Sequence, residues 1–195
     1  MRYDKGHKEA SRRRIIDAAS ERFRSDGIAA SGLAAIMNDA GLTNGAFYPH
    51  FKSKADLVRE SVAMAMDDQA NLMHQLASSG GVEAAIAAYL SADHRDSPAT
   101  GCTLAALLPE LARQPGETRS YWSERLLATV KQLASGLPPK TSDPEAAAIG
   151  IYATLIGALQ LARAVKGTPL SDRIIAAGLD AARALAGLEP ATADE

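Results

Sequence analysis

Between residues 43 and 54 the chain gathers side chains that can contact a nucleic acid. Thr43 and Asn44 can reach base edges or the methyl group of thymine. Tyr48 and His50 can donate hydrogen bonds to phosphate oxygens, and the nearby lysines supply positive charge for the same oxygens. Including one arginine further upstream, the candidate DNA contacts are Arg13, Thr43, Asn44, Gly45, Tyr48, His50, Lys52 and Lys54.

Two short apolar patterns position these side chains. The first recurs at helical spacing and predicts a helix over residues 32–39, with Ser31 as its N-cap. Its apolar members are Leu33, Ile36, Met37 and Ala40. Gly41 supplies the backbone freedom that a tight turn between helices needs. Thr43 is then the expected N-cap of a second helix over residues 44–50, which should run for one to two turns.

The second short helix should bury aromatic rings on one side and leave polar groups on the other. Phe47 and Phe51 are four residues apart and are expected to face inward, whereas Thr43, Asn44, Tyr48 and His50 are left to face outward. Gly45 allows the backbone to approach DNA closely. Pro49 disfavours helix near the end of this segment. The pattern is that of a helix-turn-helix, in which the second helix enters the major groove.

This segment resembles the TetR family of transcriptional repressors. The resemblance covers residues 9 to 60. It is carried by an ordered run of residues: Ile36, Ala40, Gly41, Leu42, Gly45, Phe47, Tyr48, His50, Phe51, Ser53, Lys54 and Leu57. It implies DNA contact by this region, a homodimer on a palindromic operator, and release by a small-molecule effector. It further implies a helix-turn-helix domain over residues 1–53 and a helical effector-binding and dimerisation domain over residues 54–190.

The rest of the chain also favours an all-α fold, because no alternating apolar and polar segment stands out. Ser53 can cap a long helix, and Ser78 to Gly81 should interrupt it. Asp143 is the expected N-cap of an apolar helix that Pro144 begins. The helices expected outside the central motif span residues 9–25, 54–77, 82–94, 102–113, 117–135, 144–166 and 169–186.

Charge is distributed unevenly along the chain. Residues 1–60 carry 11 Lys and Arg against 8 Asp and Glu, whereas the remainder carries 10 against 15. A mildly basic end on an acidic body suits a partner such as DNA, which touches only that end. Arg12 to Arg14 allow two interpretations, either phosphate contact or an ordinary solvated helix face. Tyr48 and His50 could instead pack the small domain from outside, and Lys52 could serve only solubility.

Two surfaces are predicted for the helical body. Small residues in the last two helices should let copies of the chain pair into a four-helix interface through Gly150, Ala153, Gly157, Leu161, Ile175, Gly178, Leu179 and Ala182. The alternative is that residues 144–166 form only the body's central core helix. An effector cavity should be lined by Tyr89, Cys102, Leu107, Trp122, Leu126 and Leu155, although each could be ordinary core. Cys102 is either a redox sensor or a packing residue.

No enzyme chemistry is predicted. The four histidines lack metal-ligand spacing, the single cysteine has no second thiolate beside it, and no glycine-rich phosphate loop occurs, so neither a metal nor a cofactor is expected. No apolar run approaches the length of a membrane span, and a cytoplasmic location is expected. The sequence therefore predicts a ligand-responsive DNA-binding repressor, and the alternative is a helical small-molecule-binding or interaction protein without DNA binding.

Overall fold

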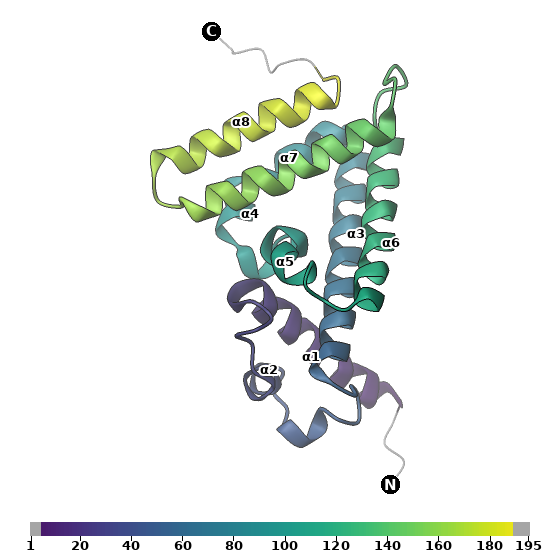
Figure 1. Cartoon of the computed structure of the whole chain (residues 1–195), viewed down its shortest axis with the longest axis vertical. Helices are drawn as coiled ribbons and strands as arrows, with labels where there is room; N and C mark the ends of the chain where they lie inside the picture. The colour runs from purple at the N-terminus through teal and green to yellow at the C-terminus, as the bar shows by residue number, and fades with distance from the viewer. Residues whose placement is uncertain (1–4, 189–195) are drawn as a thin grey trace. The chain divides into compact units, whose positions relative to one another are not determined.

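A computed structural model describes residues 5–188, and all regular structure among them is helical (Figure 1). The elements are α1 Lys5–Asp26, α2 Leu33–Asp39, the 3-10 turn η1 Asn44–Ala46, α3 Lys54–Tyr89, α4 Ala92–Asp96, the 3-10 turn η2 Pro98–Thr100, α5 Thr103–Leu111, α6 Gly116–Ser135, α7 Pro144–Ala164 and α8 Pro169–Leu185. The all-α prediction is confirmed.

The described chain divides into two compact units. Unit 1 holds residues 5–67 and 98–119, and unit 2 holds residues 68–97 and 120–188. The predicted domain boundary between residues 53 and 54 coincides with the start of α3. It stays a prediction, and the last two residues of the predicted second domain, 189 and 190, lie outside the described residues.

Unit 1 is built around buried side chains of α1 and of the segment that enters α3. Ile15 and Phe23 of α1 are fully buried, as is Leu57 in the first turns of α3. Ser20 donates a hydrogen bond of 3.1 Å to the carbonyl oxygen of Ser61, which ties α1 to α3 inside this core. Removing these apolar surfaces from water is what stabilises so small a helical cluster.

The connection between α1 and α2 corrects one predicted cap. Ser31 does not cap α2, because its hydroxyl turns back and donates to the carbonyl oxygen of Gly27 at 2.6 Å. The N-cap position of α2 is instead occupied by Gly32, which offers no side-chain bond. Ser31 is fully buried, and its hydrogen bond goes to the residue that follows α1 rather than to α2. The predicted turn at Gly41 is confirmed, with a φ of 66°.

Unit 2 is built on α7 and α8, which pack along one another. The predicted cap of α7 is confirmed, since Asp143 accepts a hydrogen bond of 3.0 Å from the backbone N–H of Ala146. The predicted interruption after residue 77 is also confirmed. Helix α3 contains non-helical backbone at Gly80 and Gly81, where φ is −136° and 74°. The predicted helix over residues 82–94 is wrong at its end: α3 stops at Tyr89, and Ser91 caps the separate short helix α4.

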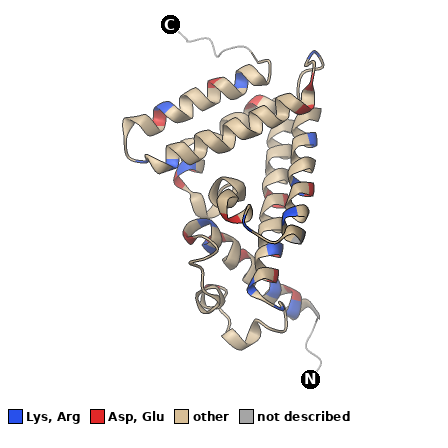
Figure 2. Cartoon of the chain, viewed as in Figure 1, with Lys and Arg blue, Asp and Glu red and all other residues tan. Residues whose placement is uncertain are grey.

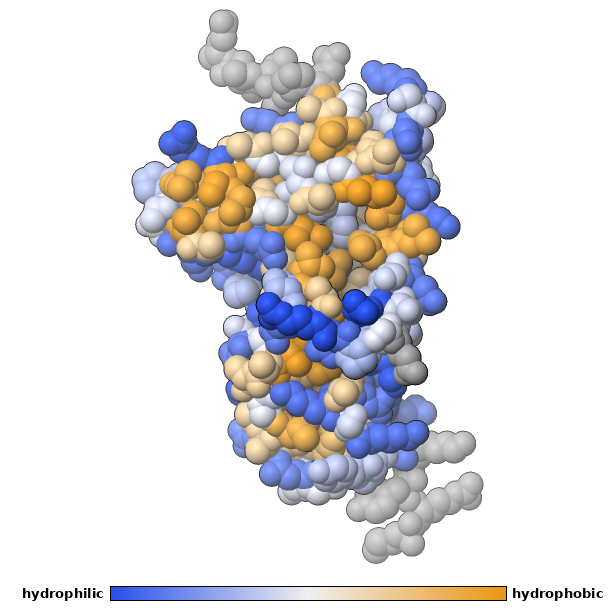
Figure 3. Space-filling model, viewed as in Figure 1, coloured by the Kyte–Doolittle hydropathy of each residue, from blue (hydrophilic) through white to orange (hydrophobic). Residues whose placement is uncertain are grey.

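Part of the surface of α7 and α8 is apolar. On α7, Ile149 and Leu161 are exposed by 53% and 61%, and on α8 Leu170 and Leu185 are exposed by 48% and 43%. Figure 3 shows hydrophobic surface over these two helices. Large apolar side chains that gather on one face of a protein often mark a contact with another molecule.

The expectation that no apolar run approaches the length of a membrane span is wrong for helix α7. Its 21 residues are apolar enough, by length and composition, to cross a membrane. Figure 2 shows the helix almost free of charged residues between its ends. In the structure, 39% of the most apolar window is buried, and the helix packs along α8. A core helix of a soluble protein satisfies the same criteria, so this is weak evidence for a span.

Candidate nucleic-acid interface and helical cavity

The element expected to read DNA is shorter than predicted. Only Asn44–Ala46 form a 3-10 turn, and the next residues continue as irregular turns rather than as an α-helix. Thr43 occupies the N-cap position but makes no side-chain bond there. Pro49 has no backbone N–H to donate, which explains why a regular helix does not run through to residue 50. The segment is closed at its end by the N–H of Phe51, which donates to the carbonyl of Phe47 at 3.1 Å.

Beneath this turn lies a pair of aromatic rings, as predicted. Phe47 and Phe51 are 2% and 1% exposed, and their ring centroids are 5.6 Å apart in a stacked arrangement. Tyr48, by contrast, is 72% exposed and meets the edge of the Phe47 ring. The stacked pair therefore fixes the turn on the core of unit 1 and aims Tyr48 at solvent.

The polar residues of the turn are available to a ligand. Thr43, Asn44 and Gly45 are exposed together with Tyr48. At Gly45, an added Cβ would meet nothing within 4 Å, so the surface there is open to the close approach of another backbone. A short row of hydroxyl, amide and bare backbone groups is suited to the floor of a DNA groove.

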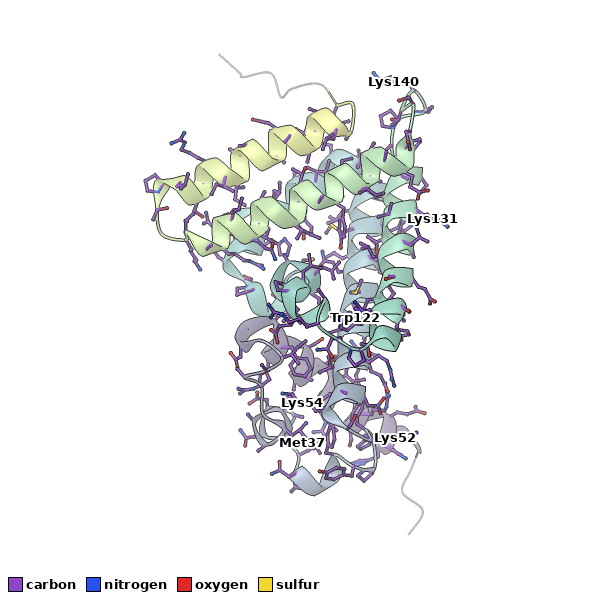
Figure 4. The ribbon with its side chains drawn as sticks, in the orientation of Figure 1. Met37, Lys52, Lys54, Trp122, Lys131 and Lys140 are labelled. Atoms are coloured by element: carbon purple, nitrogen blue, oxygen red, sulfur yellow. The ribbon has the colours of Figure 1, made fainter. Side chains whose placement is uncertain are left out.

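The two lysines after the turn differ in their surroundings (Figure 4). Lys52 is exposed, and its backbone N–H donates to Asp56 at 3.2 Å. Lys54 is half-buried, and its ammonium group donates to the carbonyl oxygen of Ile28 at 2.6 Å. Between them, Ser53 caps α3 as predicted, since its hydroxyl accepts from the N–H of Asp56 at 3.1 Å. Lys52 thus offers an exposed cation, whereas the ammonium group of Lys54 is bound to the connection between α1 and α2.

Arg12 and Arg13 of α1 have partners within unit 1. Arg13 donates to Asp17 at 2.8 Å, one turn further along the exposed face of the helix. Arg12 forms an ion pair with Glu60 and lies over the ring of Phe51, with 4.9 Å between its guanidinium carbon and the ring centroid. Arg12 therefore braces the turn against α1 through a cation–π contact.

His50 lies in a positively charged environment. Burial lowers the pKa of His50 below its usual value, and the charges of Lys8 and Arg12 lower this pKa further. Its Nδ1 atom is buried without a hydrogen-bond partner in the described structure. The lowered pKa favours the neutral imidazole, and a nearby anion such as phosphate would favour the charged form instead.

Unit 2 contains a cavity of about 70 Å3 between α3, α6 and α7. Its lining residues are Ala70, Met73, His74, Ala77, Val82, Ala85, Ile86, Tyr89, Thr129, Gln132, Leu133, Gly136, Tyr152 and Leu155. Of the residues predicted to line an effector cavity, the structure brings Tyr89 and Leu155 together here.

The other predicted lining residues lie elsewhere. Cys102 and Leu107 are buried in unit 1. Trp122 is buried on α6, and Leu126, on the same helix, is 37% exposed at the surface. Sequence reasoning missed the walls on α3 and α6, although both repeat at helical spacing: residues 70, 73, 74 and 77, and residues 129, 132, 133 and 136.

The predicted dimer residues separate into two groups. Gly178 and Ala182 are buried within the chain, and an added Cβ on Gly178 would lie 2.5 Å from the Cβ of Ala158 on α7. Ile175 and Leu179 are half-buried. On α7, Ala153 and Leu161 are exposed, and Gly157 has nothing within 4 Å of an added Cβ. Gly150 is half-buried, and an added Cβ there would lie 3.5 Å from the side chain of Leu185.

Comparison with known proteins bears on the first sixty residues. The family model of the bacterial regulatory proteins of the tetR family matches residues 15–61, which run from α1 into α3. The HTH-type transcriptional regulator TtgR of Pseudomonas putida is 42% identical over 59 residues, which are 30% of this chain and 28% of TtgR. The HTH-type transcriptional regulator AcrR of Shigella flexneri is 39% identical over 59 residues, 30% of this chain and 27% of AcrR. The match spans less than a third of either relative.

Solved structures resemble the chain over most of its length. A TetR-family transcriptional regulator from Cytophaga hutchinsonii has a TM-score of 0.77 at 20% identity, covering 95% of this chain and 98% of that one. The reduced form of E. coli NemR has a TM-score of 0.71 at 18% identity, covering 86% and 94%. At such identities the likeness shows the fold. Over residues 15–61 the chain therefore matches the TetR family of transcriptional regulators, and over most of its length it shares the fold of solved structures from that family.

Proposed function

We propose that the chain is a homodimeric repressor that binds a palindromic operator and leaves it when a small molecule occupies the cavity of unit 2. The observation that carries the DNA-binding part is the exposed turn that contains Thr43, Asn44, Gly45 and Tyr48, fixed on the stacked pair Phe47 and Phe51. This turn lies within the segment that matches the family model. Its site of action is the cytoplasm, where its operator lies.

Each copy offers a single short turn to the groove, so two half-sites are needed for specificity. The apolar face of α7 supports pairing with a second copy. Ile149, Ala153, Gly157 and Leu161 follow one another every fourth residue, and two of these are large exposed apolar side chains. On α8 the small residues Ala177, Ala181 and Ala184 are also exposed. Small residues allow close helix approach, as a four-helix interface requires.

The experiment is a footprint of the DNA that flanks the chain's own gene, with binding measured at increasing salt. Binding should protect two half-sites about one helical turn apart and weaken steeply as salt rises. Tyr48→Ala should weaken binding without changing the unfolding midpoint, because Tyr48 is 72% exposed. Tyr121→Ala on α6 is the matched control. Equal binding by Tyr48→Ala and the parent would contradict the assignment.

One observation favours the alternative, a helical small-molecule-binding protein without DNA binding. Arg13 and Lys54, two of the predicted phosphate contacts, are engaged by Asp17 and by the carbonyl of Ile28. Lys52 and Tyr48 nevertheless remain exposed on the same surface. The footprint separates the two functions, because the alternative predicts no protection at any salt concentration.

A further inference from the structure

We propose that the cavity of unit 2 selects an uncharged, compact and largely apolar molecule, of the size of one aromatic ring, with a single polar group. This inference rests on the proposed effector function of the same cavity and names the chemical class of the effector. It follows from four features of the wall: its apolar surface, its lack of charge, its polar groups, and its position across the break in α3.

The wall is largely apolar and comes from three helices. Met73, Ala77, Val82 and Ile86 contribute from α3, and Leu133 contributes from α6. Binding against such a wall removes the apolar surface of a ligand from water, which makes the free energy of binding more favourable. Tyr89 and Tyr152 add aromatic faces against which a ring can pack.

No Asp, Glu, Lys or Arg is among the lining residues. Glu83 is adjacent in sequence to the lining residue Val82, but its carboxylate accepts from Arg183 at 2.7 Å. A charged ligand would therefore give up part of its hydration without gaining an Asp, Glu, Lys or Arg partner among the lining residues, which disfavours its binding. The wall discriminates against both acids and amines on this ground alone.

The polar groups of the wall lie on different helices. They belong to His74 and Tyr89 on α3, to Thr129 and Gln132 on α6, and to Tyr152 on α7. The amide of Gln132 can both donate and accept, and an imidazole can do either according to its tautomer. A neutral ligand with one hydroxyl or one ring N–H can satisfy such a group, and this fixes its orientation.

A ring-sized occupant is larger than the cavity as it stands, since a cavity of about 150 Å3 holds benzene, whereas this one measures about 70 Å3. The inference therefore requires the wall to widen on binding, and the lining residues lie on both sides of the break in α3. Ala77 precedes the non-helical residues Gly80 and Gly81, and Val82 follows them. Gly81 has a φ of 74° and nothing within 4 Å of an added Cβ, whereas an added Cβ on Gly80 would lie 2.7 Å from the Cβ of Ala84.

The test measures ligand binding to the full chain in the absence of DNA, by thermal shift and calorimetry. Indole and phenol are the neutral probes, and benzoate and benzylammonium are charged probes of similar size. Indole or phenol should raise Tm in a dose-dependent way, as expected for a ligand that binds only the folded state. Benzoate and benzylammonium should need at least a tenfold higher concentration to raise Tm by the same amount. Equal or better binding of a charged probe, or no binding of either neutral probe, would overturn the inference.

Two variants link any binding to this cavity. Ala85→Phe fills the space and should abolish binding of indole, with circular dichroism as the check on folding. Gln132→Glu introduces a negative charge into the wall, which should weaken indole at least fivefold and strengthen benzylammonium. Gln75→Glu is the matched control, because Gln75 is exposed on α3 and does not line the cavity. The same shift in both glutamate variants would contradict the site.

DNA release is measured separately with the operator bound. If indole binds with the predicted selectivity but leaves the operator complex unchanged, the proposed effector function fails and the chemistry of the cavity stands. If charged and neutral probes bind alike and both release DNA, the effector function stands and the inference fails.

Discussion

The carboxylate of Glu110 on α5 accepts a hydrogen bond of 3.2 Å from the backbone N–H of Ile28. The same carboxylate accepts from the N–H of Ala29 at 3.1 Å. Both N–H groups belong to the connection between α1 and α2, and Lys54 binds the carbonyl of Ile28. The α5 segment, residues 98–119, belongs to unit 1, although the chain on both sides of it belongs to unit 2. Glu110 thus fastens this inserted segment to the connection between α1 and α2.

Removing this fastening should destabilise unit 1. Glu110→Ala leaves two backbone N–H groups without their charged acceptor, which should lower the free energy of unfolding by about 1.5–3 kcal/mol. Glu110→Gln keeps one acceptor oxygen and should cost less. The measurement is the urea midpoint at constant m-value. Glu124→Ala, an exposed glutamate on α6, is the control. Equal midpoints for Glu110→Ala and the control would show that the two bonds do not contribute.

Lys52 and Lys54 should respond differently to substitution. Lys52→Ala removes an exposed cation, so DNA binding should weaken, and the slope of log K against log salt should fall by about 1 for each phosphate that is no longer neutralised. Stability should not change. Lys54→Ala also removes the bond to the carbonyl of Ile28, so it should lower the free energy of unfolding by about 1 kcal/mol in addition. Anisotropy titrations at several salt concentrations and urea unfolding check both. Equal stability of Lys54→Ala and Lys52→Ala would show that the bond from Lys54 to Ile28 does not stabilise the fold.

His50 should make DNA binding depend on pH. Its pKa is lowered by burial and by Lys8 and Arg12, so the free protein favours the neutral imidazole. A phosphate beside it would raise this pKa, so the complex should take up a proton. Affinity should rise as pH falls from about 8 to about 6. His50→Gln should flatten the profile, whereas His74→Gln, on α3, should leave it intact. A profile that His50→Gln does not alter would rule out this contact.

The same lowered pKa has the opposite effect on the stability of the free protein. Because the unfolded state binds the proton more readily, the contribution of His50 to stability is complete above the unfolded pKa of about 6.5. It is lost as pH falls through the lower pKa of the folded state. Mild acid should therefore strengthen the DNA complex while weakening the free fold, and His50→Gln should reduce both effects.

The apolar face of α7 should hold the dimer together. Leu161→Glu places a charge at a side chain that is 61% exposed in the single chain and that the proposed interface buries. The dimer should dissociate to monomers, because an unpaired charge in an interface costs several kcal/mol. Light scattering after size exclusion gives the mass. Leu126→Glu on α6 should remain dimeric, and dissociation of this control would place the interface elsewhere.

The sequence was informative where local chemistry decides the outcome. Phe47 and Phe51 are buried as their spacing indicates, and Ser53, Asp143 and Gly41 act as predicted. Each of these predictions depends only on residues within about one turn in sequence. The shortened turn at Asn44–Ala46 is the exception, because the effect of Pro49 extends further back than a simple helix end would suggest.

The sequence was least informative where distant residues decide. Ser31 looked like a helix cap, but burial against the end of α1 turned its hydroxyl to Gly27. Lys54 stays a predicted phosphate contact, and its bond to Ile28 depends on a fold that brings together residues 26 positions apart. Gly178 stays a predicted contact between copies, and within the chain it packs against Ala158. In each case the partner within the chain could not be inferred from spacing.

The central claim is that the exposed turn on the Phe47 and Phe51 pair binds an operator as one half of a dimer. The most direct measurement is fluorescence anisotropy of the full chain with a labelled duplex from the flank of its own gene, in dilute buffer. The account predicts saturable binding of two chains per operator, with affinity that falls steeply as salt rises. Absence of binding to that flanking duplex, together with a monomeric mass at the same protein concentration, would contradict it.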